Sequence, residues 1–380
     1  MPVGKLLVVR ELAAIDMPGG EEFVATLRRA WDSGDAVLPV DQRLSATAKA
    51  SVVDALRPSR IVTAEGSTAM GTGVPVETGD ALVVATSGTT GEPKGVVLTH
   101  DAVRASAVAT SSRLGVDPAA HRWLACLPLS HVGGLSVVTR SILTGTPCTV
   151  LPGFDARTVM AFSGPDVLVS LVATALLRVD AAAFRTVVLG GSAPPQSLPG
   201  NVVTTYGMTE TGSGVVYDGL PLEGVEVRVD PSSGEIHLKG PMLLRAYRDG
   251  TVPLDTEGWF PTGDAGSFGG DGRLRVDGRI GDLIVTGGEN VWPPAVESAL
   301  ATHPKVAEVA VAGRPDPEWG QRVIAWVVPS DPVSPPRLEE LRDLVAERVA
   351  PFAAPKRLVL VETLPKTAIG KVRRELLAEP

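Results

Sequence analysis

The stretch Thr86-Ser87-Gly88-Thr89-Thr90-Gly91-Glu92-Pro93-Lys94-Gly95 decides the interpretation of this chain, and it directly follows the apolar run 81–85. Glycines let the backbone bend so that several N–H groups can converge on an anion. The hydroxyls of Thr86, Ser87, Thr89 and Thr90 add hydrogen-bond donors, and Lys94 adds a positive charge. A loop of this composition predicts a phosphate site, and therefore nucleotide chemistry.

Two well-known phosphate loops do not fit this stretch. A P-loop requires Gly-x-x-x-x-Gly-Lys-Ser/Thr, whereas here Gly88 is followed by Gly91 and Lys94 by Gly95, so no hydroxyl follows the lysine. A Rossmann Gly-x-Gly-x-x-Gly is absent as well. A flexible surface loop rich in serine, threonine and glycine is the alternative interpretation.

The composition narrows the class of protein. The chain has 380 residues, enough for two domains, and a formal net charge of −8, which gives a nucleic-acid partner no electrostatic support. No apolar run approaches the roughly 20 residues of a membrane helix, and the N-terminus lacks the apolar core of a signal peptide. Cys126 and Cys148 stand in apolar surroundings, as free thiols do in a reducing compartment. We therefore expect a cytoplasmic protein without a membrane span or a nucleic-acid partner.

Short apolar, β-branched runs alternate with helix-like stretches through the first two-thirds of the chain. Such strands suit a sheet that helices cover on both faces. The runs are 81–84, 149–151, 167–171 and 186–189. Asp101 is the expected N-cap of a helix over residues 102–107, which would place Lys94 in a turn between a strand and a helix.

The pattern changes in the last part of the chain. Residues 220–276 contain short segments separated by Gly, Pro and Asp turn residues. Polar and apolar residues alternate within two of these segments, 226–230 and 235–239, which predicts a small β-rich subdomain. A compact unit of about 100 residues follows Gly281, a plausible size for a small domain. In it we expect an acidic-capped helix over 294–301, strands over 306–312 and 322–328, and an amphipathic helix over 338–349.

The predicted fold class is α/β with two domains. Residues 1–280 form a large multi-layer N-terminal domain of helix-covered sheets plus the small β-rich subdomain, and residues 281–380 form a small α+β C-terminal domain.

The opening stretch, continued by Val96-Val97-Leu98-Thr99-His100, resembles the signature of the adenylate-forming superfamily: acyl-CoA synthetases, adenylation domains of peptide synthetases, and luciferases. Six further segments resemble the motifs of that family, in the family's order. They are residues 128–134 (acyl pocket), 189–194 (adenine side), 205–211 (adenine and metal), 258–264 (ribose), 278–282 (hinge) and 364–371 (catalytic lysine).

The resemblance implies two half-reactions. A carboxylate attacks the α-phosphorus of ATP to give an acyl-adenylate and pyrophosphate, and the thiol of CoA then attacks the acyl carbon so that AMP leaves. It also implies Mg²⁺ as cofactor, because the first step brings a carboxylate against a polyanion.

The resemblance assigns roles within the nucleotide site. Glu210 would bind Mg²⁺, Thr209 would donate to the α-phosphate, and Tyr206 would stack on adenine. Asp264 would accept hydrogen bonds from both ribose hydroxyls, and Arg279 would reach the ribose or the α-phosphate. The other nucleotide-binding residues expected are Thr86, Ser87, Gly88, Thr89, Thr90, Lys94, Gly191, Ser192, Ala193, Thr205, Gly207 and Met208.

The C-terminal segments would act in both steps. Lys371 would be the mobile catalytic cation that bridges the acyl oxygen and the α-phosphate, with Lys366 a weaker candidate; a basic tail is the alternative for both. Gly281, beside Asp282, would be the hinge about which the C-terminal domain rotates. The expected tunnel for the CoA thiol is lined by Gly287, Gly288 and Asn290, and an ordinary turn is the alternative for the glycine pair.

Four residues are candidates for binding the acid. Arg140 stands in the apolar run 135–143, and a buried arginine requires an anion, either a structural partner or a second carboxylate on the substrate. His131 is expected at the floor of the pocket, unless it is structural, and Gly134 and Ser136 are expected to line it.

The region ahead of the phosphate loop is shorter than is usual in the family. Together with residues 130–136 and 287–291, the short chain resembles compact CoA ligases that activate an aromatic acid with two carboxylates. Two alternatives stay open: a CoA ligase for another aromatic or fatty acid, and a non-catalytic nucleotide-binding paralogue. A homodimer is compatible with all three.

Overall fold

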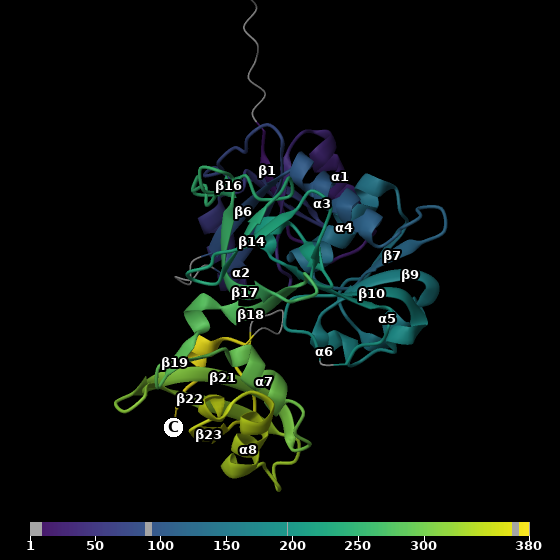
Figure 1. The fold of residues 1–380 in the computed structure, drawn as a ribbon. Coiled ribbons are helices and arrows are strands. Elements are labelled where there is room, and N and C mark those ends of the chain that lie inside the picture. The colour runs from purple at the N-terminus through teal and green to yellow at the C-terminus, as the bar shows by residue number, and fades with distance from the viewer. Residues whose placement is uncertain (1–9, 88–92, 196, 367–371, 380) are drawn as a thin grey trace, which may run out of the picture. The chain divides into compact units, whose positions relative to one another are not determined.

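The computed structural model describes residues 10–87, 93–195, 197–366 and 372–379, which form two compact units (Figure 1). The first unit comprises Met1–Pro194, Leu198–Val227 and Leu238–Phe260, and the second comprises Pro195–Ser197, Arg228–His237 and Pro261–Pro380. Residues 261–280 thus group with the C-terminal part of the chain, whereas the sequence placed them in the N-terminal domain. The boundary at Gly281 stays a prediction.

The first unit contains two seven-stranded sheets. The first sheet has the order β16-β6-β5-β2-β1-β3-β4, with parallel pairing among β1, β2, β3 and β5 and antiparallel pairing of β4, β6 and β16. Its strands are β1 (Leu12–Ile15), β2 (Ala36–Pro39), β3 (Arg60–Thr63), β4 (Gly66–Ala69), β5 (Asp80–Ser87), β6 (Pro93–Thr99) and β16 (Ala246–Tyr247).

The second sheet has the order β13-β12-β11-β10-β9-β7-β8. Strands β7 to β11 pair in parallel, whereas β12 and β13 add antiparallel pairs at one edge. Its strands are β7 (Arg122–Ala125), β8 (Cys148–Val150), β9 (Gly164–Leu171), β10 (Phe184–Leu189), β11 (Val202–Gly207), β12 (Gly214–Tyr217) and β13 (Leu220–Pro221).

Helices cover these sheets, which explains why the strands are uniformly apolar. Helices α3 and α4 pack on each other, α3 against β5 and β6 and α4 against β7, β8 and β9, so they form a layer between the sheets (Figure 1). Helix α2 adds Val52 and Leu56 to an apolar cluster on the first sheet. The helices are α1 (Glu21–Asp32), α2 (Ala46–Leu56), α3 (His100–Arg113), α4 (Val132–Thr144), α5 (Ala156–Ala161) and α6 (Ala173–Leu176), with 3₁₀ turns at Ala181–Ala183 and Thr209–Thr211.

The start of α3 corrects two expectations. The N-cap is Thr99, whose Oγ1 accepts the N–H of Ala102 at 3.1 Å, and Asp101 lies in the first turn instead. Lys94 lies in β6 opposite Thr86 of β5, not in a turn before a helix. The phosphate stretch therefore joins the two strands of a β-hairpin.

The second unit contains most of a four-stranded sheet and all of a five-stranded one. The first has the order β14-β15-β17-β18, and the other has the order β20-β19-β22-β21 with β23 on β22. The strands are β14 (Glu226–Val229), β15 (Glu235–Lys239), β17 (Phe260–Phe268), β18 (Leu274–Arg279), β19 (Ile284–Thr286), β20 (Glu289–Val291), β21 (Val306–Asp316), β22 (Gly320–Pro329) and β23 (Arg357–Leu360).

Both faces of the five-stranded sheet are covered. Helices α7 (Pro293–Leu300) and α8 (Leu338–Arg348) pack on one face, and Leu364 and Leu377 pack near Trp326 on the other. Helix α7 has no acidic cap, contrary to expectation: its N-cap is Trp292, and prolines occupy its first turn. The remaining 3₁₀ turns are Ile280–Asp282, Pro351–Ala353 and Arg374–Leu376.

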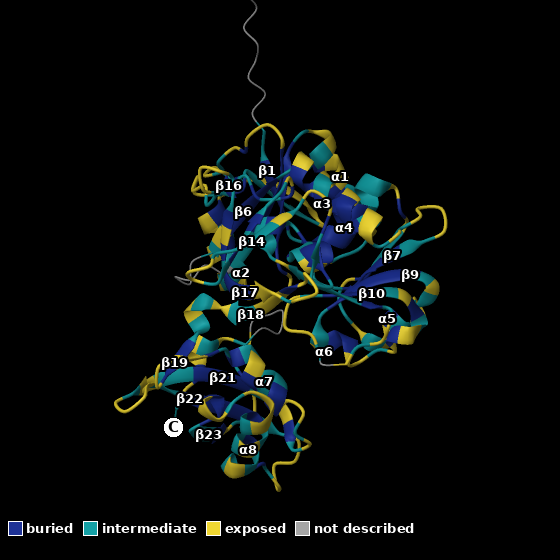
Figure 2. Cartoon of the chain, viewed as in Figure 1, coloured by how far each residue is buried: buried dark blue, intermediate teal, exposed yellow. Residues whose placement is uncertain are grey.

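The predicted α/β class, with a large helix-covered sheet domain and a smaller C-terminal domain, is confirmed. Figure 2 shows buried residues concentrated along the strands and exposed ones on the loops. Among the described helices, none combines the length and the apolar character that a bilayer span requires. Cys126 is buried and Cys148 half-buried, both are free thiols, and burial raises the pKa of each to about 12.

A buried carboxylate fixes the start of β5. Asp80 is 1% exposed; its Oδ1 accepts from Nε of Arg245 at 2.8 Å, and its Oδ2 from the N–H of Glu77 at 2.9 Å. The carboxylate of Glu77, which is 70% exposed, binds the same arginine at 2.7 Å.

We predict that Asp80→Ala lowers the free energy of unfolding by about 3 kcal/mol, because it removes the buried carboxylate that binds Arg245 and accepts the partly buried N–H of Glu77. Glu77→Ala is the matched control and should cost less than about 1 kcal/mol, since its ion pair is exposed. Urea denaturation followed by tryptophan fluorescence measures both, and equal losses would contradict the prediction.

Candidate active site

The phosphate stretch is described at its two ends. Thr86 Oγ1 donates to the carbonyl oxygen of Lys94 at 3.4 Å, across the β5–β6 hairpin. The predicted Gly88, Thr89 and Thr90 lie outside the described residues, and Ser87 is described in its backbone only, as the last residue of β5. Of the charged side chains in this stretch, the exposed Lys94 is the one whose place can be described.

Tyr247 connects Lys94 with Glu210. Strand β16 pairs with β6, so Tyr247 lies opposite Val96, and the ammonium of Lys94 is 5.4 Å from the centroid of its ring. The hydroxyl of Tyr247 donates to Oε1 of Glu210 at 3.0 Å. The predicted phosphate lysine and the predicted metal carboxylate thus meet at one aromatic side chain. Sequence analysis missed Tyr247, because its place depends on a two-residue strand that no local pattern announces.

A cavity of about 270 Å³ lies beside these residues. Its lining includes three cationic side chains, Arg57, Lys94 and Arg248, and one carboxylate, Asp249. The guanidinium of Arg248 is held by backbone carbonyl oxygens, for example that of Leu56 at 3.1 Å. The excess positive charge favours an anionic ligand.

Glu210 fits the role of a magnesium ligand. Within the described ranges, no group of three or more His, Cys, Asp or Glu side chains gathers to hold a metal. Mg²⁺ commonly binds one or two carboxylates and takes its other ligands from phosphate oxygens and water. A single half-buried carboxylate, joined through Tyr247 to the predicted phosphate lysine, suits that chemistry.

The turn that carries Thr209 and Glu210 is tightly constrained. A Cβ on Gly207 would lie 2.3 Å from the carbonyl oxygen of Ser213, so only glycine fits there. Thr211 is buried; its Oγ1 donates to that same oxygen at 2.6 Å and accepts the N–H of Met208 at 2.9 Å.

The predicted adenine residues come from two neighbouring strands. Thr205 and Tyr206 lie at the carboxyl end of β11, and the exposed Gly191, Ser192 and Ala193 follow the carboxyl end of β10. Strands β10 and β11 are parallel, so both segments leave the same edge of the sheet, where α/β proteins bind ligands. Thr205 Oγ1 donates to the carbonyl oxygen of Leu189 at 3.2 Å and holds the two ends together.

His131 contacts a carboxylate that sequence analysis did not consider. Its Nε2 lies 3.3 Å from Oδ2 of Asp41, which is 8% exposed and bound by Arg43 at 2.6 Å. Burial, with a contribution from Arg43, lowers the pKa of His131, although Asp41 opposes the shift. Burial alone would raise the pKa of Asp41, but hydrogen bonds from Arg43 outweigh it, and the pKa is lowered.

Arg140 is buried, as predicted, at 1% exposure. Its guanidinium lies 4.7 Å from the ring of Trp123, and Nη2 donates to Oγ of Ser213 at 3.2 Å. Ser213 Oγ donates in turn to Oγ of Ser136 at 3.3 Å. Nε and Nη1 have no hydrogen-bond partner within the described part of the chain, and burial lowers the pKa of Arg140.

The space beside Arg140 is small. A cavity of about 10 Å³ is lined by Ser136, Thr139 and Arg140 among others, which is room for one water molecule. Gly134, six residues before Arg140 in α4, is required by packing, because a Cβ there would lie 2.4 Å from the carbonyl oxygen of Leu127.

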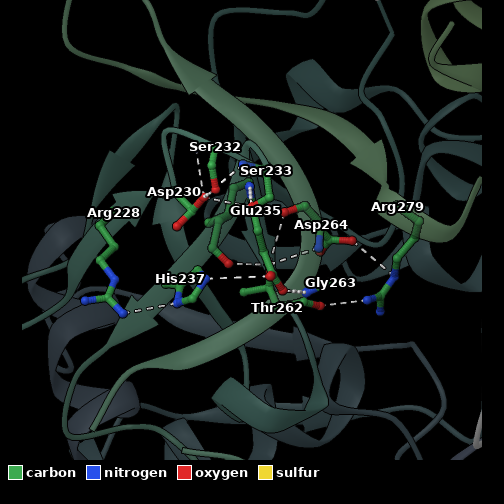
Figure 3. Close-up of polar contacts among 11 residues, drawn as sticks. Arg228, Asp230, Ser232, Ser233, Glu235, His237, Thr262, Gly263, Asp264 and Arg279 are labelled. Atoms are coloured by element: carbon green, nitrogen blue, oxygen red, sulfur yellow. Dashed lines mark hydrogen bonds and ion pairs between the residues drawn. The ribbon is translucent and has the colours of Figure 1, made fainter. Parts of the chain in front are cut away.

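The second unit brings the two predicted ribose residues together (Figure 3). Asp264 of β17 lies opposite Arg279 of β18, and Oδ1 of Asp264 is 3.1 Å from Nε of Arg279. Nη1 of Arg279 also donates to the carbonyl oxygen of Thr262 at 2.7 Å. The carboxylate and the guanidinium therefore form an ion pair across β17 and β18 of the four-stranded sheet.

The predicted hinge lies in a 3₁₀ turn. Gly281 is exposed, and a Cβ there would meet nothing within 4 Å, so the conformation itself does not require glycine. Asp282 binds Arg374 at 3.2 Å, and Arg374 also binds Glu297 at 2.7 Å. This network ties the 280–282 turn to the chain that follows Lys371.

The glycine pair forms a two-residue turn between β19 and β20. Gly287 and Gly288 have φ of +60° and +83°, as a type I′ hairpin turn requires, and Asn290 lies exposed in β20. The CoA tunnel stays a prediction. Lys366 binds Glu308 at 2.6 Å, and Lys371 lies outside the described residues.

Comparisons with known proteins agree with this architecture. The profile of the AMP-binding enzyme family matches residues 72–248, and that of the AMP-binding enzyme C-terminal domain matches residues 295–371. Fold and profiles together define the class: an AMP-binding enzyme with a large sheet domain and a smaller C-terminal domain.

Curated relatives cover most of the chain. A probable 2-succinylbenzoate–CoA ligase of Mycobacterium tuberculosis is 41% identical over 335 residues, 81% of this chain and 86% of the relative. A 2-succinylbenzoate–CoA ligase of Listeria monocytogenes is 36% identical over 332 residues, 79% of this chain and 70% of the relative. The chain therefore belongs to the AMP-binding enzymes, the adenylate-forming superfamily, which confirms the resemblance found in its motifs.

Solved structures extend the similarity to nearly the whole chain. The o-succinylbenzoate CoA synthetase of Bacillus subtilis, in complex with its acyl-adenylate intermediate, is 28% identical with a TM-score of 0.85, over 98% of this chain and 89% of that one. The same enzyme in complex with ATP and magnesium ion has a TM-score of 0.83 at 28% identity, over 97% and 90%.

The lowered pKa of His131 has a consequence for stability. Between that pKa and the ordinary value of 6.5, the unfolded chain binds more protons at this residue than the folded chain, so stability falls as the pH falls through this window. We predict that His131→Gln flattens the dependence of the melting temperature on pH as the pH falls below the ordinary value of 6.5. Thermal scans across that range measure it, and an unchanged slope would refute the prediction.

Proposed function

We propose that the chain is an ATP-dependent CoA ligase that converts 2-succinylbenzoate, through an acyl-adenylate, to 2-succinylbenzoyl-CoA in menaquinone biosynthesis, with release of AMP and pyrophosphate. The observation that carries this proposal is the 41% identity over 335 residues to a probable ligase for this acid, at 86% coverage of that relative. The meeting of Lys94, Tyr247 and Glu210 supports the nucleotide part of the proposal.

The residues of the first unit would receive the triphosphate. Lys94 neutralises phosphate charge from β6, beside a cavity whose charged lining residues are three cations and one carboxylate. Glu210, with Tyr247 holding its carboxylate, would bind Mg²⁺, which when present neutralises charge on the phosphates and the leaving pyrophosphate. Thr209 stands one residue before Glu210 in the same constrained turn, and donates to the α-phosphate.

The residues of the second unit would act on the ribose and on the reacting atoms. Asp264 accepts from the ribose hydroxyls, with Arg279 beside it. Lys371 balances the negative charge that develops on the acyl oxygen and the α-phosphate. Rotation about Gly281 would exchange Lys371 for the tunnel residues Gly287, Gly288 and Asn290 in the thioester step.

The acid would bind around α4. Nε and Nη1 of Arg140 find no acceptor among the residues that the structure describes, which supports a role in binding the second carboxylate of the substrate. His131, at the N-terminus of α4 and near Asp41, would line the same pocket with Gly134 and Ser136. We further infer a cytoplasmic location, and a homodimer as an assembly to be tested by light scattering.

The substrate is tested with a panel of acids. Purified protein with ATP, Mg²⁺ and CoA should release pyrophosphate and AMP with 2-succinylbenzoate, at a higher kcat/KM than with benzoate or a medium-chain fatty acid. A fatty acid that outcompetes 2-succinylbenzoate would establish the alternative ligase. Binding of ATP without turnover of any acid would establish the non-catalytic paralogue.

Arg140 is tested by Arg140→Met, which keeps the volume of the side chain and removes its charge. We predict that KM for 2-succinylbenzoate rises about tenfold or more, while KM for benzoate changes less than about twofold, because only the first acid has a second carboxylate to lose its partner. Equal changes for both acids would assign Arg140 to packing and to a buried water.

Lys371 is tested by separating the half-reactions. We predict that Lys371→Ala slows adenylate formation by about a hundredfold or more and spares CoA transfer to adenylate supplied from outside. Lys366→Ala is the control and should change neither step strongly, because Lys366 is engaged with Glu308. Loss of both half-reactions in Lys371→Ala would show that the role of the lysine is misassigned.

A further inference from the structure

The segment of β17 that carries the predicted ribose carboxylate is held to the neighbouring strand β15 by two hydrogen bonds that involve side chains (Figure 3). The N–H of Gly263 donates to Oε1 of Glu235 at 2.8 Å. Thr262 Oγ1 donates to the carbonyl oxygen of Ile236 at 2.7 Å and accepts the N–H of Asp264 at 3.1 Å. Residues 262–264 are therefore attached to β15 through one carboxylate and one hydroxyl.

The backbone at Gly263 needs such a support. Its φ is +71°, in the left-handed region, and a Cβ there would lie 2.9 Å from Nη1 of Arg279. This residue directly precedes Asp264, so its conformation sets the direction in which the carboxylate leaves the strand. A glycine has no side chain to restrict its backbone angles. The hydrogen bond from the N–H of Gly263 to Glu235 restricts them instead.

Glu235 is itself fixed rather than free at the surface. Its side chain is 24% exposed, and Oε2 lies 3.6 Å from Nε2 of His237 on the same strand. Nδ1 of His237 lies in turn 3.4 Å from Nη2 of Arg228 on β14. The row Arg228–His237–Glu235 ends at the Gly263 N–H, next to Asp264 (Figure 3).

We propose that Glu235 is a positioning residue of the nucleotide site, whose carboxylate sets Asp264 in the place from which it can accept both ribose hydroxyls. The inference rests on the proposed function, which assigns Asp264 to the ribose. Arg279 fixes Asp264 from the opposite strand at 3.1 Å, and Glu235 fixes the backbone just ahead of it. Glu235 does not contact the nucleotide; it acts through Gly263.

The preference for ATP over 2′-deoxyATP distinguishes a positioning role of Glu235 from a general loss of stability. A carboxylate that receives two hydroxyl groups distinguishes ATP from 2′-deoxyATP only while it is correctly placed, because a misplaced acceptor loses the second hydrogen bond first. Loss of Glu235 should therefore weaken ATP binding and leave 2′-deoxyATP binding nearly unchanged.

The experiment measures dissociation constants for ATP and 2′-deoxyATP by calorimetry, on the full chain with Mg²⁺ and without acid, so that no adenylate forms. The wild-type protein should prefer ATP by about tenfold or more, and Glu235→Ala should reduce that preference to about twofold. Glu235→Gln keeps a neutral acceptor for the Gly263 N–H and should retain most of the preference. Glu226→Ala, at an exposed position on β14 of the same sheet, is the matched control and should behave as wild type.

Asp264→Ala separates the possible failures, and melting temperatures confirm that each variant is folded at the assay temperature. If Asp264→Ala abolishes the preference while Glu235→Ala keeps it, the positioning role of Glu235 is overturned and the proposed function stands. If neither the wild type nor Asp264→Ala distinguishes the two nucleotides, the ribose assignment fails and the positioning role fails with it.

Discussion

The antiparallel pairing of β5 with β6 is the interaction on which the nucleotide side of this protein depends. It sets Thr86 opposite Lys94, one residue pair from the end at which β5 runs into β6, so the lysine has a fixed origin although its side chain is exposed. The same strand, β6, offers its other edge to β16, and that pairing delivers Tyr247 to the lysine and to Glu210. The β5–β6 hairpin, Glu210 and Tyr247 thus converge, although more than a hundred residues of sequence separate the hairpin from the other two. Strand pairing brings Tyr247 to the hairpin, and the hydroxyl of Tyr247 then reaches Glu210.

Much of this could be predicted from sequence. Patterns of buried and exposed residues within one element can be recognised in the sequence. Such patterns are the apolar runs in β5, β9 and β10, the alternation in β14 and β15, and the helical periodicity of α8. The family resemblance of residues 258–264 and 278–282 assigned Asp264 and Arg279 to the ribose, and the two residues lie on paired strands. Their role at the ribose stays a prediction.

What failed depended on contacts distant in sequence or on a choice between neighbours. Thr99 and Asp101 are both good caps, and only the strand end at Thr99 decides between them. Tyr247 and Asp41 carry no local signal, because each is placed by a partner more than thirty residues away in the chain. The hairpin around the phosphate stretch was missed because the segment after a strand was assumed to lead into a helix, as it does in most α/β proteins.

The two cysteines have a practical consequence. Each thiol is held protonated by its surroundings, with a pKa of about 12, and the chain has no others. Reagents that react with thiolates should therefore modify the native protein very slowly at neutral pH. A colorimetric titration of the remaining coenzyme would then report turnover directly, without a correction for the protein, and a cysteine introduced by design would be the one site available for labelling.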